Sequence, residues 1–370
     1  MGKSNLTKIV VSAVNFNEGG PLSVLNDCLA SLDTIARKQN IQVTVLVHKV
    51  SLVKKYAEYF NVIEFPQIKS SWFRRVYFEY FQCRKLEKIF NPDLWIALHD
   101  MTPIVTCKQV VYCHNPAPFY SMKGNELFTD PTFFLFCLFY KFLYRINIKK
   151  NEYVIVQQQW LREEFERNYK VKTIVAYPVV DVKVPLKEDV HPLQQKKEKF
   201  TFFYPAFPRV PKNFQVLLES ASLLSKKRTD FNVILSITGN ENRYATNLFN
   251  RYQHVKEVKF DGKKKREEIF ELYNEIDCMV FPSKLETWGL PISEFKNLNK
   301  PMLLADLRYA HETAANCSFL KFFNPDDPVE LANYMEILID DKLTFDSNKI
   351  NDPDKPFFNN WDKLIAFLIQ

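Results

Sequence analysis

Short runs of hydrophobic residues alternate along the chain with longer segments that have helical spacing. The first half contains the nearly continuous apolar runs "KIVVSAVNF" (8–16), "IQVTVLVHK" (41–49), "DLWIALHD" (93–100) and "KQVVYCHN" (108–115). Segments such as "GPLSVLNDCLASLDTIARKQ" (20–39) lie between them and have the spacing of an amphipathic helix. Near-continuous apolar strands separated by helices are typical of a parallel sheet that is covered on both faces. The pattern therefore predicts an α/β fold.

The alternation stops and then starts again, which predicts two domains. Residues 178–199 carry three prolines and a run of charges, a composition typical of a linker. A second series of strand-like runs follows, including "FTFFYPA" (200–206), "FNVILSITG" (231–239) and "CMVFPS" (278–283). We therefore predict an N-terminal domain over residues 1–178, a linker over 179–199 and a C-terminal domain over 200–355. In sheets of this type, ligands bind at the carboxyl ends of the strands.

Composition narrows the classes of protein to consider. With 370 residues, of which 46% are hydrophobic, the chain can bury sizeable cores and is not disordered. The net charge of +7 is modest, and 50 Lys and Arg are mixed with 43 Asp and Glu, so we expect no nucleic-acid partner. The seven cysteines show neither zinc-site spacing nor a disulfide framework, which favours a reducing, cytoplasmic location. No run reaches the roughly 20 apolar residues that a membrane-spanning helix needs.

Glycine is scarce, and its positions are informative. Five of the seven glycines follow predicted strands: Gly19, Gly20, Gly239, Gly262 and Gly289. Each suits either a simple strand-to-helix turn or a place where the backbone comes close to a ligand. Their distribution over both predicted domains favours a shared ligand-binding cleft.

The segment "FPSKLETWGLPISEFKNLNKP" (281–301) places two carboxylates on either side of one such glycine. Pro291 suits the first turn of a helix, so the N–H groups around Gly289 would form a positively polarised helix start that attracts phosphate. Glu294 would accept hydrogen bonds from vicinal hydroxyls such as those of a ribose, and Glu286 from those of a sugar. An acidic first turn also complements the helix dipole without any ligand, so both interpretations stay open at this point.

These residues carry a family resemblance. The segment "PSKLETWGLPISEFKNLNKPMLLADLRYAHE" (282–312) resembles the donor site of the retaining glycosyltransferases of family 4, whose hallmark is two glutamates with the spacing of Glu286 and Glu294. The resemblance implies a GT-B fold, with two Rossmann-like α/β domains facing each other across a cleft and a C-terminal helix (356–370) on the first domain. It also implies that a nucleotide sugar contacts the following residues: Gly19, Gly20, Arg209, Lys212, Gly239, Thr287, Trp288, Gly289, Leu290 and Glu294.

The first domain carries further matches. "NEGGPLSVL" (17–25) resembles the glycine loop of the family, and "KQVVYCHNP" (108–116) resembles the strand whose terminal His faces the reacting centre. The resemblance thus implies catalytic roles for His114 and Glu286. His99 and Asp100 end the strand "DLWIALHD" and are the acceptor-side candidates. A lone His at a strand end is also common as a structural residue.

Two departures from the family pattern bear on function. Phe207 stands where the family has an Arg for the diphosphate, and the nearest Arg209 is displaced by two residues. Thr287 replaces the first glycine of the usual EGFG pattern and Trp288 replaces its Phe, which changes the shape of the sugar pocket. The displaced Arg is also compatible with a catalytically inactive relative of the family.

The resemblance implies a metal-independent hexosyltransferase that takes its sugar from a nucleotide-diphosphate sugar and uses no cofactor. Lys212, Arg209 and the helix start would stabilise the charge that grows on the departing diphosphate. The acceptor would be a glycan or lipid-linked oligosaccharide in cell-surface polysaccharide synthesis of the O-antigen, lipopolysaccharide or capsule type. The alternatives are a nucleotide-sugar epimerase of the same architecture and a catalytically silent binding subunit.

The aromatic stretch from Phe119 to Tyr144 has two interpretations. Its phenylalanines fall on more than one helical face, so they either pack as core or present a surface to a lipid-linked glycan. Basic residues in and after this stretch would add attraction to anionic headgroups at the inner face of the cell membrane: Lys141, Arg145, Lys149 and Lys150.

Overall fold

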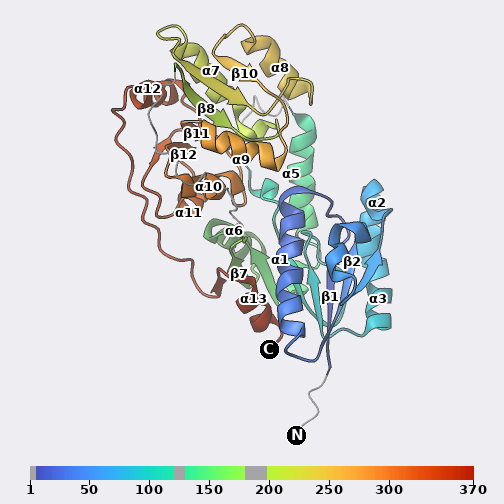
Figure 1. Cartoon of the computed structure of the whole chain (residues 1–370). Helices are drawn as coiled ribbons and strands as arrows, with labels where there is room; N and C mark the ends of the chain where they lie inside the picture. The colour runs from blue at the N-terminus through green and yellow to red at the C-terminus, as the bar shows by residue number, and fades with distance from the viewer. Residues whose placement is uncertain (1–5, 121–129, 180–197) are drawn as a thin grey trace. The chain divides into compact units, whose positions relative to one another are not determined.

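The chain folds into two compact α/β units in a computed structural model that describes residues 6–120, 130–179 and 198–370. The first unit comprises residues 6–120, 135–179 and 352–370, and the second comprises residues 130–134 and 198–351 of the described part. Both contain a parallel sheet with helices (Figure 1), which confirms the predicted α/β class. Nearly all of the predicted linker, residues 180–197, lies outside the described residues.

The sheet of the first unit has the strand order β14-β7-β6-β5-β4-β1-β2-β3, and every pairing in it is parallel. Its strands are β1 (Thr7–Ala13), β2 (Ile41–Val47), β3 (Asn61–Glu64), β4 (Leu94–Ala97), β5 (Lys108–Tyr112), β6 (Tyr153–Val156), β7 (Thr173–Ala176) and β14 (Phe357–Phe358). The central strands are buried along nearly their whole length. This burial explains why their sequences are continuously apolar and do not alternate.

Helices cover both faces of this sheet. They are α1 (Gly19–Ala36), α2 (Trp72–Tyr77), the π-helical turn Phe78–Gln82, α3 (Cys83–Phe90), α5 (Pro131–Leu143), α6 (Gln159–Tyr169) and α13 (Trp361–Leu368). Alternate residues of β1 enter different cores: Ile9 and Val11 pack with α1 and α13, whereas Val10 packs with α5 and α6. The two cores arise because successive side chains of a strand point to opposite faces.

The end of the chain belongs to the first unit. The helix α13 lies beside α1 (Figure 1), and Trp361, Leu364 and Leu368 are buried in the core that α1 also enters. Asn360 caps α13 by accepting hydrogen bonds from the N–H groups of Asp362 and Lys363. The sequence predicts a C-terminal helix over residues 356–370; the observed helix covers only Trp361–Leu368, because Phe357–Phe358 pair with β7 as strand β14.

The sheet of the second unit has the order β10-β9-β8-β11-β12-β13 and is also parallel. Its strands are β8 (Phe200–Tyr204), β9 (Phe231–Leu235), β10 (Val258–Phe260), β11 (Cys278–Phe281), β12 (Met302–Ala305) and β13 (Leu320–Phe323). Its helices are α7 (Phe214–Leu224), α8 (Arg243–Tyr252), α9 (Arg266–Glu275), α10 (Leu290–Phe295), α11 (Arg308–Thr313) and α12 (Pro328–Ile339). Strands β8 and β11 lie side by side at the centre, so the loops that follow them meet at one edge.

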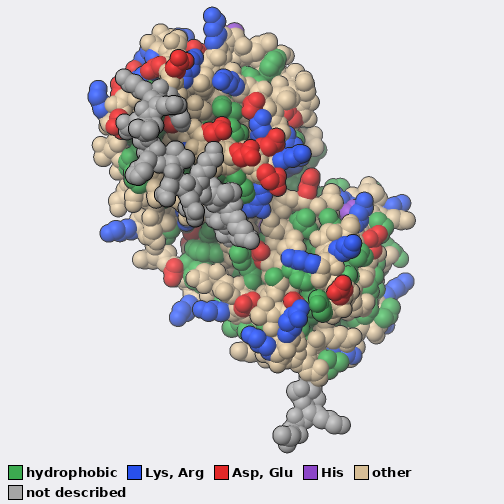
Figure 2. Space-filling view, in the orientation of Figure 1, with side chains coloured by type: hydrophobic (Ala, Val, Ile, Leu, Met, Phe, Trp, Pro, Cys, Tyr) green, Lys and Arg blue, Asp and Glu red, His purple; other side chains and the backbone are tan. Residues whose placement is uncertain are grey.

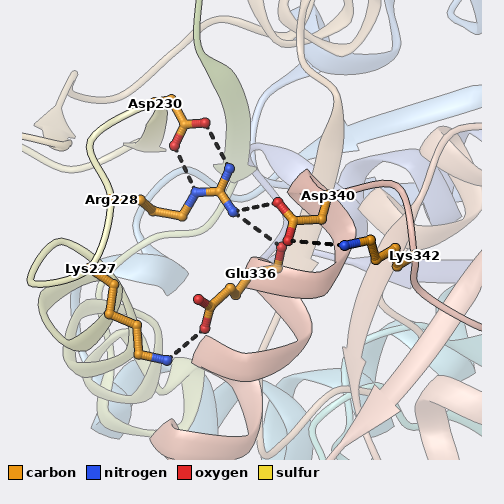
Figure 3. Close-up of polar contacts among 6 residues, drawn as sticks. All are labelled: Lys227, Arg228, Asp230, Glu336, Asp340 and Lys342. Atoms are coloured by element: carbon orange, nitrogen blue, oxygen red, sulfur yellow. Dashed lines mark hydrogen bonds and ion pairs between the residues drawn. The ribbon is translucent and has the colours of Figure 1, made fainter.

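A charged network joins α12 to the loop that follows α7 (Figure 3). Arg228 donates from Nε and Nη2 to the two carboxylate oxygens of Asp230, and from Nη1 to Asp340 at 2.8 Å. Lys227 pairs with Glu336 on α12 at 2.6 Å. These contacts lie at the far end of α7 from Lys212 and outside the candidate site, and as exposed ion pairs they should add little to stability.

A polar cluster is buried beneath the first sheet's carboxyl edge. The side chains of Glu79 and His99 are almost fully buried, and Oε1 of Glu79 lies 3.2 Å from Nε2 of His99. Arg75 donates from Nη2 to the carbonyl oxygen of His99 at 2.6 Å. Burial raises the pKa of Glu79 to about 8, although the Arg75 charge opposes the rise. Burial, reinforced by Arg75, holds the pKa of His99 well below its usual value, so both groups are neutral near pH 7.

The raised pKa of Glu79 predicts a pH-dependent stability. In the unfolded chain this carboxyl titrates near 4.5, so the proton it retains when folded stabilises the native state at low pH, and the contribution is lost as pH rises towards 8. His99 acts in the opposite sense but only below about pH 6.5, where its unfolded form gains a proton. Between pH 6.5 and 8 the wild-type protein should lose at most about 1.4 kcal/mol per pH unit through Glu79. In urea unfolding, the free energy of unfolding of the Glu79→Gln variant should decline less between pH 6.5 and 8 than that of the wild type.

Glu87→Gln provides the matched control. Glu87 accepts hydrogen bonds from the N–H groups of Thr106 and Cys107; burial opposes them, but they lower its pKa, so it is ionised in both states above pH 6.5. The Glu87 variant should be destabilised equally across the range. A decline in the Glu79 variant as steep as in the wild type would contradict the assignment.

Candidate functional site

The loop between β11 and α10 carries the glutamate motif and is held in one conformation. Gly289 has φ +86°, in the left-handed region, and a Cβ there would lie 3.2 Å from Cδ1 of Ile292. Trp288 donates from Nε1 to Oγ of Ser293 at 2.8 Å, and its carbonyl oxygen accepts the hydroxyl of Thr313. Trp288 is therefore a buried support of the loop, and the glycine is required by the backbone itself.

Glu286 meets Lys212 at the edge where β8 and β11 end. Lys212 closes the short turn Val210–Lys212 after β8, and its Nζ forms an ion pair with Oε1 of Glu286. The two loops are also joined through the backbone, because the N–H of Lys284 donates to the carbonyl of Pro211 at 2.7 Å. Both charged side chains retain some exposure. The structure thus brings together two residues that the sequence assigned to the donor site from separate motifs.

Glu294 lies on α10 and is nearly buried. Its Oε1 accepts from Nη2 of Arg266 at 3.2 Å, and its Oε2 accepts from the hydroxyl of Tyr273 at 3.4 Å. Burial raises the pKa of Glu294, while Arg266 and the Tyr273 hydroxyl act in the opposite direction. The side chain of Arg266 is 55% exposed, so the buried carboxylate of Glu294 is paired with a cation that reaches solvent.

The sequence interpretation missed Arg266 and Tyr273. Arg266 ends the basic run Lys263 to Arg266, which alone is typical of a solvated surface. Tyr273 has the spacing of an ordinary core residue of α9, and its ring is indeed buried. Only the fold shows that both side chains converge on Glu294.

The other donor-site candidates have mixed surroundings. Arg209 is exposed just before the Val210–Lys212 turn, with its guanidinium 5.9 Å from the ring of Phe207. The N–H of Gly239 donates to Oε2 of Glu241 at 2.9 Å, and a Cβ at Gly239 would lie 2.5 Å from Cβ of Phe249. The glycine is therefore required by packing, whatever it binds. Thr287 and Leu290 flank the Trp288 loop and are partly buried.

The helix that follows Gly289 is short. The helix α10 has six residues and passes directly into the short turn Lys296–Leu298. The dipole of so short a helix is small, so we place more weight on Lys212 and Arg209 as sources of positive charge.

In the first unit, Asp100 fixes the backbone that carries His114. Its Oδ1 accepts from the N–H groups of His114 at 2.8 Å and Asn115 at 3.1 Å, and from the hydroxyl of Tyr144 at 2.9 Å. Its Oδ2 lies 3.5 Å from Nε2 of His114. The ring of Phe16 packs against the imidazole of His114, with ring centroids 5.4 Å apart. His114 is thus positioned by the Asp100 carboxylate and by the ring of Phe16.

The His and Asp candidates of the first unit differ in exposure. The side chain of His114 is 19% exposed, whereas Asp100 and His99 are buried. Oγ of Ser12 lies 3.1 Å from Nε2 of His99, within the buried cluster described above. Asp100 therefore supports His114 from beneath the surface, whereas the side chain of His99 contacts Ser12 and Glu79. An acceptor-side role for either residue stays a prediction.

Gly19 and Gly20 begin α1. Gly19 is exposed and has φ +68°, and a Cβ added there would meet no atom within 4 Å. The glycine is therefore favoured by its backbone conformation and not by crowding.

The surface, the titratable groups and the helices give three further observations. On the face drawn in Figure 2, Lys and Arg side chains are scattered among Asp and Glu side chains and do not form a single stripe. Across the described residues, His, Cys, Asp and Glu nowhere gather in threes that could hold a metal ion. None of the described helices combines the length and apolar character needed to cross a membrane.

Known families match both parts of the sequence. The family described as "Glycosyl transferases group 1" matches residues 187–352, and the family "Glycosyl transferase 4-like" matches residues 29–158. The chain is also 25% identical over 302 residues to the O-antigen chain mannosyltransferase RfbU of Salmonella typhimurium, covering 74% of this chain and 76% of the relative.

Solved structures share the fold across nearly the whole chain. A glycosyltransferase from Rickettsia africae has a TM-score of 0.64 at 16% identity, covering 92% of this chain and 90% of its own. HepE of Anabaena, in complex with UDP and glucose, has a TM-score of 0.59 at 16% identity and 90% coverage of both chains. WaaG, a glycosyltransferase involved in lipopolysaccharide biosynthesis, has a TM-score of 0.59 at 15% identity, covering 88% of this chain and 90% of its own. With two glycosyltransferase families matched in order along the sequence and the fold shared throughout, the chain belongs to the group 1 glycosyltransferases of GT-B fold.

Proposed function

We propose that the protein is a retaining hexosyltransferase that moves a sugar from a nucleotide-diphosphate sugar to a glycan or lipid-linked acceptor in cell-surface polysaccharide synthesis. The observation that carries the proposal is the pairing of Lys212 with Glu286, and of Arg266 with Glu294, in the matched segment at the carboxyl edge of the second sheet. The names of RfbU and WaaG support an O-antigen or lipopolysaccharide product. The HepE complexes with UDP and with UDP-glucose support the donor class.

The charges of the second unit suit a diphosphate leaving group. Lys212 forms an ion pair with Glu286 in the free protein. We infer that the bound nucleotide sugar separates this pair, so that Glu286 accepts hydrogen bonds from sugar hydroxyls and Lys212 contacts phosphate. Arg209, exposed beside the same turn, would add a second cation. Fixed cations stabilise the charge that develops as the glycosidic bond to the diphosphate breaks. This arrangement requires no metal.

The stereochemical outcome rests on family membership alone. Departure of the diphosphate and attack on the same face of the sugar would retain the anomeric configuration. His114, fixed by Asp100, would hydrogen-bond the sugar or position the acceptor. We place the reaction in the cytoplasm, in keeping with seven cysteines that are all free.

The proposal is tested by transfer assays with a panel of nucleotide sugars in the presence and absence of EDTA. We expect one donor to release its nucleotide diphosphate only when a glycan or lipid-linked acceptor is present, at an unchanged rate in EDTA. Release without acceptor, together with an isomerised sugar, would identify an epimerase. Nucleotide binding without turnover of any donor would identify a silent binding subunit, and loss of activity in EDTA that Mg²⁺ restores would contradict metal independence.

Glu294→Ala should weaken binding of the nucleotide diphosphate. Loss of charge-assisted hydrogen bonds to the ribose corresponds to about 1.5 to 3 kcal/mol, or about a ten- to hundredfold increase in Kd. Calorimetric titration with the nucleotide that stabilises the protein most in a thermal-shift screen measures the change. Glu271→Ala removes an exposed carboxylate from α9 and should leave Kd unchanged. An unaltered Kd in the Glu294 variant would remove the ribose assignment.

His114→Ala should reduce turnover much more than nucleotide affinity, because most of the proposed nucleotide contacts belong to the second unit. The N–H of residue 114 still donates to Asp100 in this variant, so the loop should keep its conformation. We expect kcat to fall about a hundredfold with the nucleotide Kd unchanged. His254→Ala, an exposed histidine of the second unit, is the control. Equal losses in kcat and affinity, or an unchanged kcat, would exclude His114 from the reacting centre.

A further inference from the structure

Aromatic side chains project into solvent from the segment that runs from α2 through the π-helical turn. Phe73 is 88% exposed, and Tyr77 and Phe81 follow it at intervals of four residues. The rings of Tyr77 and Phe81 stack on each other, with centroids 5.4 Å apart. Three large exposed rings on one side of a short segment are unusual, because single exposed apolar residues are the norm on a protein surface.

The helix α5 exposes a second apolar row beside the first. Leu135, Leu138 and Phe142 are all more than half exposed. The ring of Trp72, at the start of α2, lies 5.1 Å from that of Phe139 on α5, centroid to centroid. The two rows therefore form one continuous surface. We call this surface the aromatic-basic face and define its apolar part as Phe73, Tyr77, Phe81, Leu135, Leu138 and Phe142.

Both helices are anchored on their opposite sides. Phe78 and Cys83 enter the core of the first unit from one segment, and Tyr140 and Leu143 enter it from α5. Arg75 donates to the hydroxyl of Tyr140 at 3.2 Å and ties the two helices together. The exposed rings thus project from elements whose opposite sides are anchored in the core.

The exposed charges of the two described segments that carry these apolar rows are all of one sign. Residues 68–90 expose Lys69, Arg74, Arg84, Lys85 and Lys88. The two carboxylates of that segment, Glu79 and Glu87, are turned inward and buried. Residues 131–150 expose Lys141, Arg145, Lys149 and Lys150 and contain no Asp or Glu. Within the described residues 68–90 and 131–150, which carry the aromatic-basic face, nine cations and no Asp or Glu are therefore exposed.

We propose that the aromatic-basic face docks the protein onto an anionic membrane surface. Rings and leucines would enter the boundary between headgroups and acyl chains, and the surrounding cations would contact acidic lipid headgroups. The charges argue against a second copy of the chain as occupant, because a two-fold symmetric contact would set nine cations against nine. This surface extends the membrane contact suggested by the aromatic stretch to the α2–α3 segment, and it does not depend on the transfer reaction.

The test is flotation of the full-length protein with vesicles, without donor or acceptor. We expect binding to phosphatidylcholine vesicles that contain about 30% phosphatidylglycerol, and little binding to phosphatidylcholine alone. Raising the salt from 0.1 to 1 M should weaken the binding, because screening shortens the Debye length from about 10 to about 3 Å. Equal binding to both vesicle types, or none to either, would overturn the proposal.

Two sets of variants locate the contact. Phe73→Ser combined with Phe81→Ser should reduce the vesicle-bound fraction at least tenfold, while Val329→Ser, at an apolar residue of the second unit that is 64% exposed, should not change it. Arg84→Glu, Lys85→Glu and Lys88→Glu together should also reduce the vesicle-bound fraction at least tenfold.

The charge control is the reversal of three exposed lysines elsewhere, Lys38, Lys54 and Lys256, which gives the same net charge. Equal loss in both triple variants would mean that net charge alone drives binding and would overturn the assignment of this face. The substituted side chains are exposed, so unchanged thermal unfolding should confirm that each variant is folded. The opposite outcome is a wild-type protein that sediments as a dimer, binds no vesicles and becomes monomeric in the Phe73→Ser, Phe81→Ser variant. That result would assign the face to self-association and refute membrane docking.

Discussion

Parallel strand pairing is the constraint on which the rest of this protein depends. Every strand pairing described in both sheets is parallel, so all carboxyl ends within a sheet lie along one edge. Lys212 and Glu286 are 74 residues apart in the sequence but follow the neighbouring strands β8 and β11. Their ion pair and the backbone hydrogen bond between their loops form because those two strands are adjacent. The same rule places Asp100 after β4 beside His114 after β5.

The two units hold their candidate residues by different means. In the second unit, charged side chains pair across loops and remain partly exposed, so a ligand can exchange with the existing partners. In the first unit, Oδ1 of Asp100 accepts hydrogen bonds from two N–H groups and a tyrosine hydroxyl, which restrict the backbone of His114. A group fixed in advance loses little entropy when a reaction needs it in one place. The buried Glu79 and His99 beneath it stay neutral near pH 7, so Arg75 is the cation that Asp100 faces there.

The aromatic-basic face shows how one helix can serve both the core and the surface. Tyr140 and Leu143 of α5 are buried, while Leu138 and Phe142 on the same helix remain in solvent. Exposed apolar area of this size costs free energy in water, about 25 cal/mol per Å², which a docked surface would recover. For an enzyme whose proposed acceptor is attached to lipid, such a contact would also keep the protein where that acceptor is found.

The sequence by itself determined the α/β class, the division into two domains and the family, because continuous apolar strands and the Glu286–Glu294 spacing are local patterns. It also selected Lys212 and His114 as candidates, through motifs that are contiguous in the chain. Only the tertiary structure showed that Arg266 and Tyr273 meet Glu294, since those contacts join α9 to α10. Burial of His99 and the convergence of α2 with α5 were likewise decided by packing. A sequence pattern fixes which face of an element is apolar, whereas the partner of a side chain depends on which distant elements the sheet order brings together.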